Sequence, residues 1–245
     1  MPLAPERYLE QLRSDGAALA AAAAVDTSAR VPGCPDWDVA ALVGHTGVIH
    51  RWVAEILRTR AQERPSRRGF AAPEGGPAVL EWYRGGLDLL VGALEDAGPD
   101  ADVWNWARPR QPSAFWFRRM AQETAVHRWD AQSATGTPAG VPQDLAVDGI
   151  AEMLESFLPL LSTAGPPPDL GGSLHVHATD TEGEWTVRPG PEHLEVEPGH
   201  GKGDAAVRGA ASDLLLALWG RPVFDRLETF GDSSVVERWR ERVRF

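Results

Sequence analysis

The first half of the chain carries apolar residues at helical spacing. In residues 5–26, apolar side chains recur every three or four positions among many alanines, the residue that favours helix most strongly. The same period recurs in three later segments, residues 36–60, 77–97 and 113–134. Asp36 or Asp38 is placed to cap the second helix. Residues 61–76 and 98–112 read as loops, so the pattern predicts four amphipathic helices typical of a four-helix bundle.

The second half changes from a helical period to alternation. A further helix is predicted over residues 144–163, and Gly165–Asp169 contains three prolines and reads as a linker. Four short segments then alternate apolar and polar residues, as half-buried strands do: residues 174–178, 184–188, 193–197 and 205–209. Helices are predicted at 212–219 and 233–244. We therefore predict an α+β protein, with a helical bundle over residues 1–165 and a smaller α/β domain over residues 170–245.

Composition narrows the partners and the compartment. A net charge of −11 argues against nucleic acid or an anionic membrane as the main partner. The single cysteine, Cys34, excludes an internal disulfide and a cysteine-rich zinc site, and favours a cytoplasmic protein. We interpret Cys34 as a packing residue, with a pocket-lining role as the alternative. The apolar run at residues 17–25 is too short to span a bilayer, and the N-terminus lacks the layout of a signal peptide.

Glu123 and His127 are the first candidates for chemistry. Four residues apart on a predicted helix, they lie about 40° apart around its axis, on the face that carries Trp116 and Met120. A carboxylate buried there needs a partner, because an unpaired buried charge costs several kcal/mol. The pair alone fits an ordinary helix ion pair at least as well as two metal ligands.

The second predicted helix adds His45 and His50. They lie about 140° apart around the helix, so both cannot reach one ligand. Each flanks the apolar stripe, and periodicity does not choose between them. Either one, together with Glu123 and His127, would form a set of two histidines and one glutamate. Such a set suits zinc, with a fourth position open for water or a thiolate.

Two stretches resemble a known family. The run Pro32–His45 and the run Glu123–Asp130 resemble the mycothiol-dependent maleylpyruvate isomerase family, which belongs to the DinB-like metal-binding four-helix bundles of actinobacteria. Residues 206–210 and 218–221 resemble the family's small C-terminal α/β domain, so the resemblance covers nearly the whole chain. In the family the first metal histidine lies eight residues after the tryptophan that opens the second helix. Trp37 therefore implies His45 as a ligand, beside Glu123 and His127.

The resemblance also implies an activity. Family members hold a divalent metal, here expected to be zinc. They use a low-molecular-weight thiol, expected here to be mycothiol, whose thiolate attacks an electrophilic carbon. The expected outcome is S-transfer to, or cis–trans isomerisation of, a small electrophile such as maleylpyruvate. An arginine of the C-terminal domain lies near the active site in the family. Arg221 is the candidate catalytic residue here and Arg208 the second choice, with an ordinary surface position as the alternative for both. We expect a monomer or small homo-oligomer.

Two other functions stay open at this level. A bundle of this kind could bind a metal or a ligand without turnover. Metal-assisted hydrolysis is the third possibility, and it ranks last because no second carboxylate is placed as a general base.

The remaining candidates have competing interpretations. Asp130 could orient a ligand histidine, but pairing with an arginine, such as Arg128 or one from another helix, is the favoured interpretation. His175 and His177 share one strand face and could mimic a metal pair, yet no third partner is evident, so a solvated strand face is favoured. His193 and His200 are expected to be exposed in turns.

The tryptophans are expected mainly in the core. The members considered are Trp37, Trp52, Trp104, Trp106 and Trp116. Of these, the loop pair Trp104 and Trp106 could wall the site, and the loops at 61–76 and 98–112 are expected to shape its substrate end.

Overall fold

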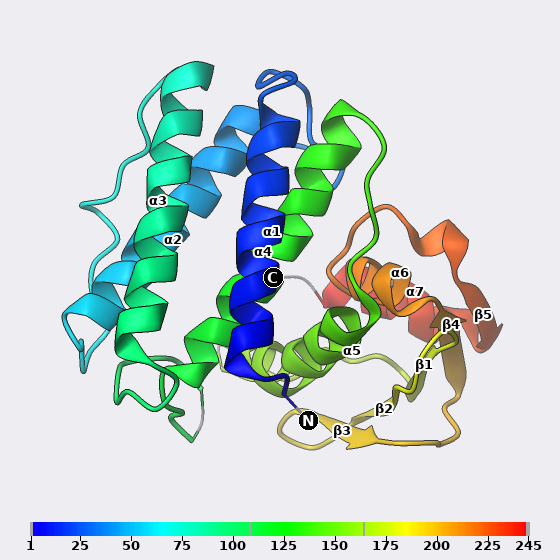
Figure 1. The fold of residues 1–245 in the computed structure, drawn as a ribbon. Helices are drawn as coiled ribbons and strands as arrows, with labels where there is room; N and C mark the ends of the chain where they lie inside the picture. The colour runs from blue at the N-terminus through cyan, green and yellow to red at the C-terminus, as the bar shows by residue number, and fades with distance from the viewer. Residues whose placement is uncertain (1, 108, 164, 244–245) are drawn as a thin grey trace. The chain divides into compact units, whose positions relative to one another are not determined.

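Two compact units make up the protein. The computed structural model describes residues 2–107, 109–163 and 165–243, and it divides into Met1–Ala139 and Gly140–Phe245. The first unit is built from four long helices: α1 (Pro5–Ala23), α2 (Val39–Arg58), α3 (Gly76–Ala97) and α4 (Ala114–Thr135) (Figure 1). The predicted α+β class and the N-terminal four-helix arrangement are confirmed.

Two local features set the start of α2 and its distance from α3. Asp38 is the cap of α2, because its side chain accepts a hydrogen bond of 2.8 Å from the backbone N–H of Ala41. α2 and α3 approach closely at Gly47, where a Cβ atom would lie 2.5 Å from the ring of Trp82. The absence of a side chain at Gly47 therefore fixes the spacing of this helix pair.

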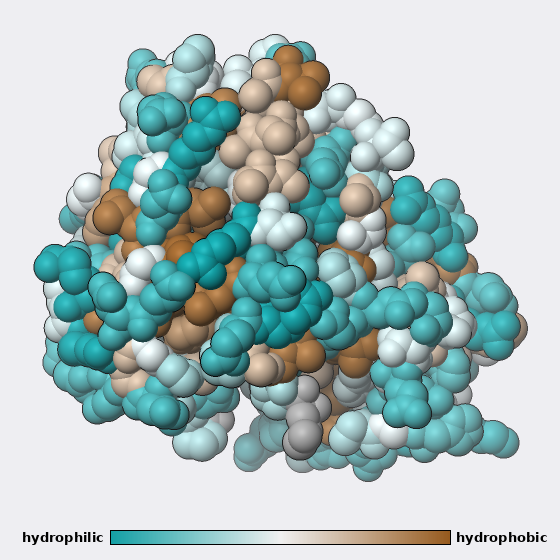
Figure 2. All heavy atoms as spheres, viewed as in Figure 1, coloured by the Kyte–Doolittle hydropathy of each residue, from teal (hydrophilic) through white to brown (hydrophobic). Residues whose placement is uncertain are grey.

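The core of the first unit joins α1, α2, α3 and α4. Its fully buried members include Leu19, Leu42, Val43, Tyr83 and Ala131. Cys34 is half-buried and packs against this core, as expected for a packing residue. The space-filling view shows mostly hydrophilic side chains on the face drawn, with some apolar ones between them (Figure 2).

The second unit contains a five-stranded sheet in the order β3-β2-β1-β4-β5. The strands are β1 (Leu174–Ala178), β2 (Glu184–Pro189), β3 (Leu194–Pro198), β4 (Ala205–Gly209) and β5 (Glu228–Gly231). β1 and β4 are parallel, and the other neighbours are antiparallel. The sequence pattern missed β5 because all four of its residues are exposed and none alternates into the core.

Three helices belong to this unit. They are α5 (Gln143–Glu152), α6 (Ala211–Leu218) and α7 (Ser233–Arg242). α5 continues through a π turn (Met153–Phe157) and a 3-10 turn (Leu158–Ser162), and a second 3-10 turn spans Phe224–Arg226. Because α5 packs against α6, the division of the chain falls before this helix and not at the proline-rich linker that the sequence pattern favoured.

The two faces of the sheet differ in polarity. α6 packs against β1 and β4, and α7 packs against β4, so these helices cover the apolar face (Figure 1). That face buries Leu174, Val176, Val187 and Val207. The alternate residues of β1 and β2 point to the other face, and they are polar: His175 pairs with Thr186, and His177 pairs with Glu184. None of the helices in the described ranges is long and apolar enough to span a membrane.

Candidate metal centre

Three side chains from two helices meet in the bundle. His45 comes from α2, and Glu123 and His127 come from α4. The Nε2 atoms of His45 and His127 each lie 3.4 Å from Oε1 of Glu123. Metal–ligand distances of 2.0–2.1 Å in a tetrahedral site place neighbouring ligand atoms about 3.3 Å apart. The three atoms are thus spaced as ligands of one small cation would be.

His50 has a different environment. Its side chain is fully buried, and its Nε2 forms a hydrogen bond of 2.9 Å with Oγ1 of Thr124. Its ring packs 5.5 Å from that of Tyr83, measured between centroids. Burial lowers the pKa of His50 to about 3, so the imidazole is neutral. Of the two histidines that periodicity left open, only His45 joins Glu123 and His127.

Neutral His50 makes stability depend on pH. The unfolded chain binds a proton at this residue below pH about 6.5, whereas the folded chain does not until pH about 3. Acidification therefore favours unfolding, and this residue should remove about 2 kcal/mol of stability between pH 7 and pH 5. Urea unfolding of wild type and His50→Gln, in chelator at both pH values, measures the effect.

Glutamine can keep the contact to Thr124 but does not titrate, so the variant should lose less stability on acidification than wild type. An equal loss in both proteins would rule out His50 as the titrating group. The chelator prevents metal release from contributing to the difference.

Two buried side chains orient the ligand candidates. Oδ2 of Asp130 lies 3.0 Å from Nδ1 of His127 and fixes the ring with Nε2 toward Glu123. Arg119 donates from Nη2 to Oε2 of Glu123 at 2.9 Å, leaving Oε1 toward the histidines. Arg128 pairs with Asp15 at 3.0 Å, whereas Asp130 contacts His127, so an orienting role for Asp130 gains support and its pairing with an arginine stays a prediction. Sequence reasoning missed Arg119, although its position one helical turn before Glu123 was a usable signal.

These contacts set the ionisation of the pair on α4. Burial opposes charging of Glu123, but hydrogen bonds from His127 and His45 and the charge of Arg119 outweigh it and hold the pKa of Glu123 well below its usual range. Burial likewise opposes protonation of His127, and Asp130 and Glu123 outweigh it and raise the pKa of His127. The carboxylate is therefore ionised at neutral pH and available to a cation.

Trp37 and a surface hollow adjoin the cluster. The ring of Trp37 lies 4.8 Å from that of His45 and 6.2 Å from that of His127, between centroids. Beside His45 is a hollow of about 430 Å³, and loop residues 72–75 form part of its wall. Part of the loop at 61–76 therefore borders the cluster, and its role in shaping a substrate site stays a prediction.

Trp104 and Trp106 pack in an aromatic cluster. Both contact Trp116, and Trp104 also contacts Trp52. Trp116 lies two helical turns before Glu123, about 10 Å along α4. Trp37 is therefore the tryptophan whose ring contacts His45 and His127, whereas Trp104 and Trp106 pack against Trp116. A wall role for Trp104 and Trp106 stays a prediction.

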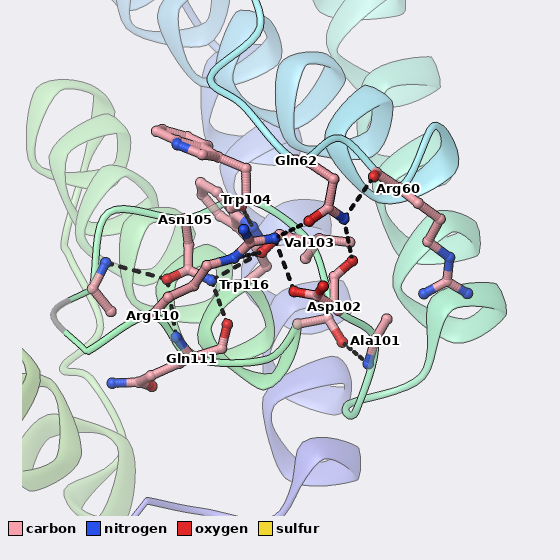
Figure 3. A network of polar contacts seen from close by, with 12 residues as sticks. Arg60, Gln62, Ala101, Asp102, Val103, Trp104, Asn105, Arg110, Gln111 and Trp116 are labelled. Carbon is pink, nitrogen blue, oxygen red and sulfur yellow. Dashed lines mark hydrogen bonds and ion pairs between the residues drawn. The ribbon is translucent and has the colours of Figure 1, made fainter.

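A polar network holds the loop that carries this pair of tryptophans (Figure 3). Buried Asn105 donates to the carbonyl of Gln111 at 2.6 Å and accepts from the N–H of Ala107 at 3.2 Å. Arg110 donates to Oε1 of Gln62 at 2.8 Å and pairs with Asp102 at 2.9 Å. The described part of the loop is therefore internally braced.

The two arginine candidates belong to the C-terminal unit. Arg221 follows α6, is half-buried, and donates from Nη1 to the carbonyl of Trp219 at 2.9 Å. Arg208 is exposed on β4 and pairs with Glu228 across to β5 at 3.1 Å. The guanidinium of Arg208 is thus engaged by a carboxylate on the surface of the sheet.

Two family models match the chain. The mycothiol maleylpyruvate isomerase N-terminal domain matches residues 7–132, and the C-terminal domain of the same family matches residues 144–238. The chain belongs to the mycothiol maleylpyruvate isomerase family. The N-terminal match, residues 7–132, includes His45, Glu123 and His127.

Solved structures agree in fold. A crystal structure of the mycothiol-dependent maleylpyruvate isomerase has 15% sequence identity and a TM-score of 0.66, with 93% of each chain covered. A histidine-to-alanine mutant of such an isomerase has 13% identity and a TM-score of 0.65, also with 93% of each chain covered. At this identity the likeness establishes the fold alone. A search of curated proteins found no match.

Proposed function

We propose that this protein is a divalent-metal-dependent enzyme that uses a low-molecular-weight thiol, mycothiol, in S-transfer to or cis–trans isomerisation of a small electrophile such as maleylpyruvate. One observation carries the proposal: a single oxygen of Glu123 faces the Nε2 atoms of His45 and His127, both at 3.4 Å. The family name supports the choice of thiol and substrate class.

The donor set fits a zinc-class ion. Two imidazole nitrogens and one carboxylate oxygen are ligands that zinc takes in catalytic sites, where the fourth position stays open. A divalent cation bound there would favour the deprotonated form of a thiol, which is the nucleophile that S-transfer and isomerisation require.

The surrounding side chains keep this set in place and bias its charge. Asp130 holds the ring of His127, and Arg119 holds the second oxygen of Glu123. Among these groups, the positive charges of a divalent cation and Arg119 would exceed the negative charges of Glu123 and Asp130. The centre would therefore attract an anionic thiol and a carboxylate-bearing substrate.

Arg221 is our proposed substrate-binding residue. A guanidinium group matches a carboxylate through paired N–H donors. Arg221 is half-buried, whereas Arg208 is exposed and paired with Glu228, so Arg221 is the better choice of the two.

The test is an assay with maleylpyruvate, with and without mycothiol, on protein purified without chelator. We expect substrate consumption only when thiol and metal are both present, and Arg221→Met should raise the KM for substrate more than that for thiol. Turnover without thiol would favour hydrolysis. Thermal stabilisation by thiol without product, across several electrophiles, would favour a binding module.

A further inference from the structure

Three histidines gather around one carboxylate on the polar face of the sheet. His175 and His177 come from β1 and Glu184 comes from β2, where cross-strand pairing puts them on one face. Nε2 of His175 lies 3.2 Å from Oε2 of Glu184, and Nδ1 of His200 lies 2.9 Å from the same oxygen. The sequence offered no further partner for His175 and His177, and the structure supplies two, Glu184 and His200.

We propose that His175, Glu184 and His200 form a second divalent-metal site, separate from the one in the bundle. Their candidate ligand atoms all lie within 4.8 Å of one another. The two contacts to Oε2 of Glu184 are close to the spacing of about 3.3 Å between neighbouring ligands in a tetrahedral zinc site. Two imidazoles and one carboxylate select a late first-row ion such as Zn²⁺ or Ni²⁺ over Mg²⁺ or Ca²⁺.

The site repeats the layout of the bundle centre with different residues. In both, one carboxylate oxygen faces two imidazole nitrogens. The other oxygen of Glu184 lies 3.1 Å from Nδ1 of His177, as that of Glu123 does from Arg119 at 2.9 Å. Nδ1 of His175 lies 3.2 Å from Oγ1 of Thr186, a hydroxyl that can accept the Nδ1 proton and so leave Nε2, the atom that faces Glu184, free for an ion.

A glycine-rich turn brings His200 to the sheet. Gly199 has a φ of +102°, which L side chains rarely adopt, and its N–H donates to the carbonyl of Glu184 at 2.8 Å. At Gly201 a Cβ would lie 2.5 Å from Oγ1 of Thr186, so the turn passes close above the strand. The backbone therefore holds His200 beside Glu184, although its side chain is 85% exposed.

The cluster remains open to a further ligand. A hollow of about 600 Å³ adjoins it, lined by His177, Glu184 and His200 among others. Three protein ligands leave at least one position of a tetrahedral ion for water or a small anion. A bound ion would also cross-link the turn at 199–203 to β1 and β2.

Zinc titration of the full-length, metal-stripped protein tests the proposal by equilibrium dialysis. Wild type should bind two equivalents and His200→Ala one, since removing a ligand should weaken this site more than about tenfold. His193→Ala is the matched control, because His193 is also exposed in a turn of this unit but lies outside the cluster. It should bind as wild type does.

His127→Ala separates this site from the bundle centre. It should leave one equivalent, and His127→Ala combined with His200→Ala should leave none. Retention of the wild-type stoichiometry in His200→Ala would overturn the proposal, and so would an equal loss in His193→Ala. If His127→Ala changed nothing while His200→Ala lost one equivalent, the bundle centre would fail and the sheet site would stand. Thiol-dependent turnover should be unchanged in His200→Ala.

Discussion

Glu123→Gln should remove one equivalent of divalent metal per chain and lower thiol-dependent turnover at least about 100-fold. The carboxylate is the only ligand candidate whose one oxygen faces both imidazoles of the bundle cluster, at 3.4 Å each. Neutralising it removes charge attraction to the cation and leaves Arg119 beside an uncharged amide. Loss of a second-shell partner typically costs 10–100-fold in metal affinity or activity, so loss of this ligand should cost more.

Graded variants make this expectation specific. His45→Ala and His127→Ala should behave as Glu123→Gln does, whereas Asp130→Asn should weaken metal binding by about 10–100-fold because it only orients His127. His50→Gln is the control on the same helix as His45. Elemental analysis of each protein purified without chelator gives the count, and full metal retention in Glu123→Gln would contradict the assignment.

The sequence predicted the helices and most strands because burial leaves a periodic trace. It did not predict β5, whose residues Glu228–Gly231 are all exposed. It could not choose between His45 and His50, because each flanks the apolar stripe of α2 and the packing of α2 on α4 decides which ring meets Glu123. Only the family's spacing from Trp37 pointed to His45.

Polar partners were the hardest part to predict. Asp130 lies three residues after His127 and shares a helix face with it, whereas the buried partner of Arg128 is Asp15 on α1, distant in the sequence. The cluster of His175, Glu184 and His200 on the sheet is also formed by residues that are distant in the sequence. Glu184 and His200 are distant from His175 in the chain, and strand pairing and the turn at Gly199 bring them together. Such contacts are tertiary, so no periodicity encodes them.

The ion pair between Asp15 and Arg128 joins α1 to α4 inside the bundle. Its two side chains are 5% and 3% exposed, and Nε of Arg128 lies 3.0 Å from Oδ1 of Asp15. Gln11 donates to the other oxygen of Asp15 at 2.9 Å, and Arg128 also donates to the carbonyl of Ala139. The pair is therefore desolvated and hydrogen-bonded on both sides.

Asp15→Ala should lower the free energy of unfolding by about 3–5 kcal/mol, because it leaves the guanidinium of Arg128 buried without its counter-charge. Urea unfolding followed by circular dichroism measures the loss. Arg13→Ala is the control, because Arg13 lies two residues before Asp15 on the same helix and forms an exposed pair with Glu95. Breaking that pair should cost no more than about 1 kcal/mol. The double variant Asp15→Leu with Arg128→Met should recover much of the stability, since apolar replacements remove both charges together. Equal losses in Asp15→Ala and Arg13→Ala would mean that burial of the pair contributes nothing to the stability of the bundle.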